Sequence, residues 1–188
     1  LWRGLLDSQA VYVRDALADA DNVSVILFSL MIGGMVGIIS RNGGMNGIVE
    51  LIVRRADTPR HSQLATAAMG TAIFFDDYAN ALLVGSTMRP LTDRLNISRE
   101  KLAWLVDSTA APVTTVAVIS TWVGFEMGLI QDAMVALGQE TDSAYTFFLR
   151  SLPYSFYPWL TLLMVYLIAS TGRDFGAMRV AEDRAVTT

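Results

Sequence analysis

Three aspartates stand inside long apolar stretches of this sequence, where ionisable side chains are rare. Asp76 and Asp77 lie near the middle of residues 62–88, and Asp107 interrupts residues 102–130. A carboxylate among apolar groups is costly unless it pairs with a charge, binds a cation or carries a proton. The alternative is a capping role at a helix end, for Asp107 or for one of the Asp76–Asp77 pair. We predict that Asp107 and at least one of the pair bind a cation or a proton.

Further oxygen atoms accompany these carboxylates. Asn80 follows Asp76 by four residues and therefore shares its face of a helix. Oxygen ligands suit hard cations, so we predict Na⁺ at Asp76, Asp77 and Asp107. The predicted ion-binding or proton-binding residues are Asp76, Asp77, Asn80, Asp107, Ser108 and Thr109, with Thr71, Thr121 and Glu126 as secondary candidates. For any single Ser or Thr, bonding to a helix carbonyl is the stronger alternative, and Glu126 is equally well explained as an interfacial acid.

The composition argues against several other chemistries. The chain has no cysteine and a single histidine, His61, which we interpret as a surface residue. Disulfides and thiolate metal sites are excluded for this sequence, and a histidine-based catalytic or zinc site is disfavoured. No phosphate-binding glycine motif and no ATPase motif occurs, so we expect transport driven by an ion gradient. We expect neither an enzyme nor a cofactor, with Na⁺ and H⁺ as the transported ions. No Lys or Arg interrupts residues 62–88 or 102–130, which disfavours an anionic substrate.

Two uncharged stretches indicate membrane spans. The chain is 53% apolar, with a mean hydropathy of +0.41. Residues 23–40 and 154–170 carry no charge, and each would form a helix of roughly 26 Å, close to the thickness of a hydrocarbon core. Residues 1–20 are instead amphipathic and predict an interfacial or extramembrane helix.

The distribution of basic residues predicts a re-entrant hairpin at residues 62–88. Lys and Arg are concentrated in residues 41–61, 89–101 and the tail 171–188, whereas residues 131–150 hold only Arg150. The positive-inside rule places the first three on the cytoplasmic side and residues 131–150 outside. Because residues 62–88 then begin and end on the same side, we predict that they dip into the membrane and turn near Thr71–Asp77.

Residues 102–130 are also too long for one straight crossing, at about 43 Å of helix. Pro112 removes a backbone donor and disfavours helix at the preceding residue. We predict a helix broken around Ser108–Pro112. The fold class is therefore an all-α polytopic membrane protein, with transmembrane helices, a re-entrant hairpin and a broken helix. Such elements form the midplane ion sites of secondary transporters.

Several ordered motifs carry a family resemblance. They are Phe74–Asn80 (FFDDYAN), Arg89-Pro90 with Thr92-Asp93, Ile97–Leu102 (ISREKL), Asp107–Pro112 (DSTAAP) and Thr121–Glu126 (TWVGFE). Together they resemble the NhaC-type sodium/proton antiporters. The resemblance covers residues 23–130 well and the flanks loosely, and Trp104 and Thr114 depart from the pattern. The opening helices and the second half of the family are missing, so we expect a fragment of the first half.

This resemblance implies one partial inverted repeat that exchanges sodium for protons across the cytoplasmic (inner) membrane as a multi-pass protein. Sodium and proton would compete for one carboxylate, which is a negative coupling between the two ligands. The alternative is coupled transport of an organic acid such as malate or lactate, or of an amino acid. A soluble helical scaffold is the third hypothesis. The expected partners are the lipid bilayer and the remaining repeat of the full-length chain, with a homodimer left open and no nucleic acid.

Overall fold

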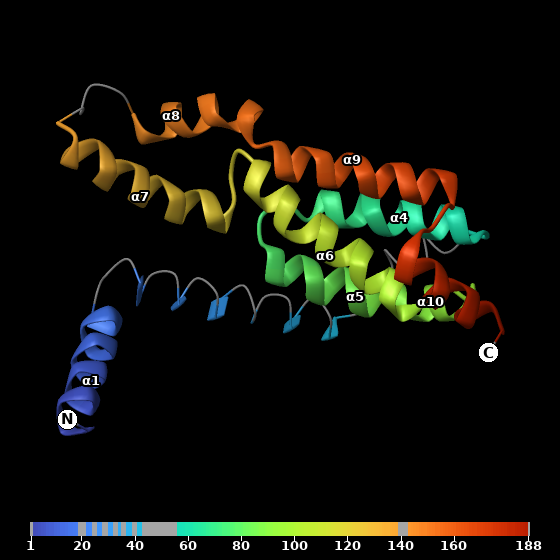
Figure 1. Cartoon of the computed structure of the whole chain (residues 1–188), viewed down its shortest axis with the longest axis horizontal. Helices are drawn as coiled ribbons and strands as arrows, with labels where there is room; N and C mark the ends of the chain where they lie inside the picture. The colour runs from blue at the N-terminus through green and yellow to red at the C-terminus, as the bar shows by residue number, and fades with distance from the viewer. Residues whose placement is uncertain are drawn as a thin grey trace. The chain divides into compact units, whose positions relative to one another are not determined.

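The computed structural model describes residues 2–18, 22–23, 26–27, 30–31, 34, 37–38, 41–42, 56–138 and 143–187 (Figure 1). The chain forms two compact units, Leu1–Asn42 and Gly43–Thr188. Most of the predicted transmembrane helix 23–40 and of the basic loop 41–61 lies outside the described residues. The first unit contains α1 (Trp2–Ala18), within the segment predicted to be amphipathic. The apolar side chains Leu6, Val13 and Leu17 of α1 are all exposed.

All regular secondary structure in the described part of the second unit is helical, without strands, as the sequence predicted. Its elements are α4 (Pro59–Ala72), α5 (Asp77–Arg94), α6 (Arg99–Val116), α7 (Thr121–Ala136), α8 (Ala144–Ser151), the 3-10 turn η1 (Leu152–Tyr154), α9 (Phe156–Thr171) and α10 (Gly176–Thr187). Local signals explain several boundaries. The Thr58 side chain accepts from the backbone of His61 and Pro59 opens α4, whereas Gly172 ends α9 in the left-handed conformation at φ 64°.

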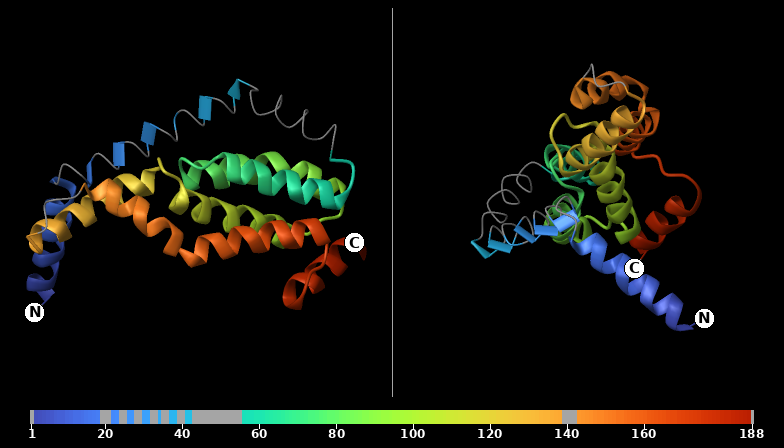
Figure 2. Two further views of the ribbon diagram at one scale, coloured as in Figure 1. Left: turned by 90° about the horizontal axis from the view of Figure 1, so that it is seen from above. Right: turned by 90° about the vertical axis from the view of Figure 1, so that its left-hand side faces the viewer.

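Helices α4 and α5 form a helical hairpin. The chain leaves helical geometry at Ile73–Asp76, inside the predicted turn, and α5 returns beside α4 (Figures 1 and 2). By helical rise, the arms are about 21 Å and 27 Å long. Figure 1 shows that α4 starts at the end of the bundle where α5 ends, where α6 starts and where α10 lies. We call this end of the bundle the α10 end.

Helix α6 is the centre of the bundle and packs along α4, α5 and α9 (Figure 2). One apolar cluster joins α4, α5 and α6 through residues that include Met69, Met88 and Val106, and a second joins Ala67, Leu105 and Val165 of α4, α6 and α9. Helices α4 and α6 lie close together at Gly70, where an added Cβ would lie 2.1 Å from Oγ1 of Thr109. Only glycine therefore allows α4 and α6 to approach this closely.

The prediction that α6 breaks at Ser108–Pro112 is wrong in position. Helix α6 continues through Pro112 to Val116, and the chain leaves helical geometry at Ala117–Ser120 instead. Proline removes one backbone bond, but α6 packs along α4, α5 and α9, and tertiary packing of this kind overrides local helix preference.

The second break ends at Ser120, whose side chain forms hydrogen bonds with both α6 and α7. Its hydroxyl donates to the carbonyl of Thr114 at 2.8 Å and accepts from the backbone of Val123 at 3.2 Å. The same side chain therefore ends α6 and caps α7, after a run of β-branched residues that has little helical preference.

Within the described residues, no single helix combines the length and apolarity needed to cross a bilayer. Two bent pairs of helices are long and apolar enough when the two members are taken together. They are α6 with α7, bent by 45°, and Ala144–Tyr154 with Phe156–Thr187, bent by 50°. The predicted span 154–170 corresponds to α9, and the predicted tail 171–188 contains α10.

Candidate functional site

Asp76 caps the second arm of the hairpin. It is 4% exposed, and its carboxylate accepts from the backbone of Ala79 at 2.7 Å. The capping alternative raised from the sequence is thus confirmed for this residue. A cap uses part of the carboxylate, whose two oxygens have about four acceptor positions, so capping leaves acceptor capacity for a second ligand.

Asn80 ties the two arms together at the same place. Its side-chain nitrogen donates to the carbonyl of Gly70 at 2.6 Å and to that of Ile73 at 2.9 Å. These are carbonyls at the end of α4, where helical partners are missing. The side chain is fully buried, and its Oδ1 has no hydrogen-bond partner. The structure therefore holds a neutral oxygen in a fixed orientation with its lone pairs unused.

The two breaks meet. The backbone of Thr121, which follows the second break, donates to the carbonyl of Phe75 in the first at 3.0 Å. The indole of Trp122 donates to Oδ1 of Asp77 at 3.2 Å. Oγ1 of Thr121 is buried there without a hydrogen-bond partner. We call this region, formed by Ile73–Asn80 and Ala117–Trp122, the break junction.

Thr71 lies one turn before the first break and connects α4 to α9. Its hydroxyl donates to the carbonyl of Ala67 at 2.8 Å and shares a 2.8 Å hydrogen bond with the hydroxyl of Tyr166. The sequence analysis did not single out Tyr166. The sequence signal that could have identified Tyr166 is its position inside the uncharged stretch 154–170. Tyrosines of an aromatic belt lie at the ends of such a stretch, whereas Tyr166 lies away from them.

The predicted ion-binding residues of α6 do not lie at the break between α6 and α7. Asp107 is exposed in the middle of α6, because the helix breaks farther along the chain. Ser108 and Thr109 are buried, and the hydroxyl of Thr109 donates to the carbonyls of Leu105 and Val106. For Thr109, the alternative that the hydroxyl bonds a helix carbonyl is therefore confirmed. Glu126 is half-buried on α7, beyond the break.

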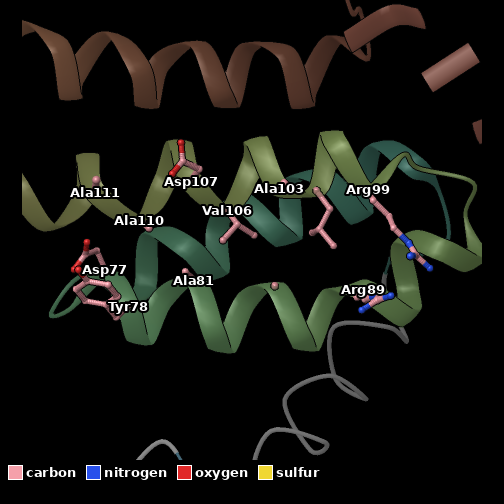
Figure 3. A pocket seen from close by; sticks show the side chains of 12 residues that line it. Asp77, Tyr78, Ala81, Arg89, Arg99, Ala103, Val106, Asp107, Ala110 and Ala111 are labelled. Carbon is pink, nitrogen blue, oxygen red and sulfur yellow. The ribbon is translucent and has the colours of Figure 1, made fainter. Parts of the chain in front are cut away.

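Asp77 and Asp107 line one pocket between α5 and α6, of about 660 Å³. Figure 3 shows Asp77 at the start of α5, while the Asp107 carboxylate lies on the side of α6 that faces away from α5. Arg89 and Arg99 line the opposite end of the pocket, and both face Asp93, at 4.0 Å and 3.6 Å. In the part of the chain that the structure describes, no three His, Cys, Asp or Glu side chains converge on one point.

Comparison with known proteins agrees with the resemblance at a coarser level. A family model described as the Na⁺/H⁺ antiporter family matches residues 113–188 and supports such a family. An uncharacterized protein of Haemophilus influenzae is 29% identical over 157 residues, which are 84% of this chain and 30% of that protein. The chain thus spans less than a third of this relative's length. No solved structure matches the chain significantly.

Proposed function

We propose that this chain forms part of a secondary transporter that exchanges sodium for protons across the cytoplasmic membrane, with the cation site at the break junction. The observation that carries the proposal is the pair of buried oxygens without partners, Oδ1 of Asn80 and Oγ1 of Thr121, beside the buried carboxylate of Asp76. A buried polar atom without a partner is costly. A bound cation would remove that cost with the oxygen ligands that hard cations prefer.

The hairpin supplies the geometry that such a site needs. Non-helical backbone at membrane depth is tolerated only inside protein or beside a water-filled cavity. In this proposal residues 62–88 form a re-entrant hairpin, and its break lies near the bilayer middle against the break between α6 and α7. A proton and Na⁺ compete for Asp76, with Asp77 as a neighbouring carboxylate, so loading one ligand releases the other. The remaining repeat of the full-length chain would complete the cavity.

The test is sodium-dependent proton movement in everted vesicles that contain the full-length protein. Asp76→Asn is the sharpest variant, because asparagine caps a helix as well as aspartate does but carries no charge. We expect it to abolish exchange while the protein stays folded. Asp77→Asn and Asp107→Asn, made singly, complete the series. Exchange that persists in all three variants would exclude carboxylate coupling.

One observation favours organic-acid transport as the second candidate function. The pocket of about 660 Å³ has Arg89 and Arg99 at one end, with Asp93 as the carboxylate that faces both. A volume in this range is typical of small-molecule sites, and two guanidinium groups suit a carboxylate ligand. Sodium-independent uptake of a labelled dicarboxylate, lost in Arg99→Gln, would support this candidate against the first.

A further inference from the structure

The pocket of about 660 Å³ between α5 and α6 has a charged end and an apolar stretch. Arg89 and Arg99 lie together at its α10 end, although they belong to different helices (Figure 3). The next part of the wall consists of apolar residues, namely Ala81, Gly85, Leu102, Ala103 and Val106. From Arg89 back to Ala81, this stretch covers about 12 Å of helix. Such a pocket suits a ligand that is charged at one end and apolar over the rest.

The charged end carries more positive than negative charge. Arg89 and Arg99 both face Asp93, with distances from Nε to the carboxylate of 4.0 Å and 3.6 Å. Both distances exceed the length of a hydrogen bond, so Asp93 leaves N–H donors of the two guanidinium groups available. Two guanidinium groups against one carboxylate therefore suit one further anionic group. Arginine binds phosphate and carboxylate groups through pairs of parallel N–H bonds.

Gly85 keeps the apolar stretch open. A Cβ added at Gly85 would have nothing within 4 Å, whereas one added at Gly70 would overlap Thr109. Gly70 therefore serves the close packing of two helices, and Gly85 does not. The space beside Gly85 belongs to the pocket and is available to an apolar chain.

The proposed topology places this pocket in the inner half of the membrane. In that topology residues 89–101 lie on the cytoplasmic side, and α5 extends from them into the bilayer. Arg89 and Arg99 then lie at the level of the lipid headgroups, and the apolar stretch lies at the depth of the acyl chains. The cytoplasmic leaflet carries a negative surface potential, and basic pockets between helices on this side bind anionic headgroups.

We propose that this pocket binds one anionic phospholipid of the inner leaflet, with its phosphate between Arg89 and Arg99 and one acyl chain along Gly85 and Ala81. The inference rests on the proposed function only for the side of the membrane, and it concerns binding rather than exchange. A small dicarboxylate would contact the two arginines but would leave the apolar stretch empty. The shape of the pocket therefore favours the lipid over the free acid.

The first experiment tests the headgroup. Binding of a phosphatidylglycerol with a fluorescent acyl chain to the purified full-length protein in detergent is compared with binding of the matching phosphatidylcholine. We expect tighter binding of phosphatidylglycerol. Arg89→Gln and Arg99→Gln should each weaken its binding about fivefold, as expected for one basic residue near an anionic lipid. Arg94→Gln is the matched control, because Arg94 is exposed in the last turn of α5 and lies outside the pocket wall.

The second experiment tests the acyl chain. Gly85→Leu fills the apolar stretch without changing any charge, and it should weaken phosphatidylglycerol binding about tenfold, the cost of about two methylene groups that lose their burial. Ser86→Leu is the matched control, because Ser86 is exposed on α5 and lies outside the pocket wall. Both variants should keep a thermal midpoint near that of the wild type, so that a loss of binding does not reflect unfolding.

Four results would overturn the lipid site. Equal affinity for the two lipids would show no anionic preference, and an equal loss in Arg94→Gln would indicate general attraction to a basic surface. Unchanged binding in Gly85→Leu, or displacement of the lipid by malate or inorganic phosphate, would indicate a site for a soluble anion. An absence of saturable binding would mean that the rest of the full-length chain covers the pocket, which also overturns the proposal. A wild-type protein that binds the lipid but exchanges no sodium for protons would overturn the proposed function alone.

Discussion

The two ends of the α4–α6 bundle are held by different interactions. At the break junction, the side chain of Asn80 bonds the carbonyls of Gly70 and Ile73, and the backbone of Thr121 bonds that of Phe75. The carboxylates of Asp76 and Asp77 accept from N–H groups there, without a basic partner in the part of the chain that the structure describes. At the α10 end, Lys101 pairs with Asp174, and Glu182 accepts from the backbone of Ser98. The junction is therefore a region of fixed geometry that leaves oxygens unpaired. The α10 end is a region that opposite charges hold together.

The largest expected effect is at the charged end. Asp174→Asn leaves the fully buried Lys101 ammonium without its counter-charge, which should cost about 3–5 kcal/mol of the free energy of unfolding. The double variant Lys101→Met with Asp174→Asn should recover most of this loss, because it removes the charge itself. Thermal midpoints of the full-length protein in detergent measure both. Equal midpoints for the single and double variants would show that the ion pair between Lys101 and Asp174 does not stabilise this end of the bundle.

At the junction, Asn80→Ala should destabilise by about 2–4 kcal/mol, because it leaves buried carbonyls at the end of α4 without their donors. Asn80→Asp separates the two roles of the side chain, since it retains Oδ1 but loses the nitrogen that donates. It should be destabilised as Asn80→Ala is. A midpoint like that of the wild type for both variants would mean that Asn80 does not hold the hairpin closed.

Gly70→Ala should cost about 1–3 kcal/mol, because the new Cβ would overlap Thr109, which is buried and stiff about its first torsion. Gly85→Ala on α5 is the matched control, since nothing lies within 4 Å of its added Cβ. Alanine there should be neutral or slightly stabilising. If both variants have the same midpoint, α4 and α6 do not approach each other as described.

The smallest effect is expected at Glu100, in the first turn of α6 and within the basic segment 89–101 that we place outside the membrane. Backbone hydrogen bonding at the start of α6, with a further contribution from Arg184, lowers the pKa of this exposed carboxyl below its ordinary value of 4.5. Its contribution is therefore present above pH 4.5 and is lost as the pH falls through the lowered value. Glu100→Gln should leave the midpoint at pH 7 nearly unchanged and should reduce its fall in acid. A large loss at pH 7 would contradict this.

The sequence predicted the first break better than the second. Basic loops on both sides of residues 62–88 and two adjacent aspartates point to one turn, and the chain breaks at Ile73–Asp76. Pro112 pointed to the wrong place for the second break, because the packing of α6 against three other helices overrides the local effect of a proline. The true break depends on the contact between Ser120 and Thr114, which no proline or glycine marks.

The candidate site was predictable in its residue types but not in its assembly. The spacing of Asp76 and Asn80 alone predicted that they lie on one side of a helix, and the structure places Asp76 at the N-cap of α5. Thr121 joins them only because the second break lies beside the first, and Tyr166 reaches Thr71 only through the packing of α9. The pairing of Lys101 with Asp174 likewise joins residues far apart in the chain. Contacts of this kind follow from tertiary packing, which residue spacing does not encode.

The most direct test of the account is the sidedness of the hairpin's two ends. Single cysteines replace Arg60, at the start of α4, and Arg89, near the end of α5, in a cysteine-free version of the full-length protein, and a membrane-impermeant thiol reagent is applied to each face. The account predicts that both positions react from the cytoplasmic face. Reaction from opposite faces would mean that residues 62–88 cross the membrane, and the cation site at the break junction would have to be abandoned.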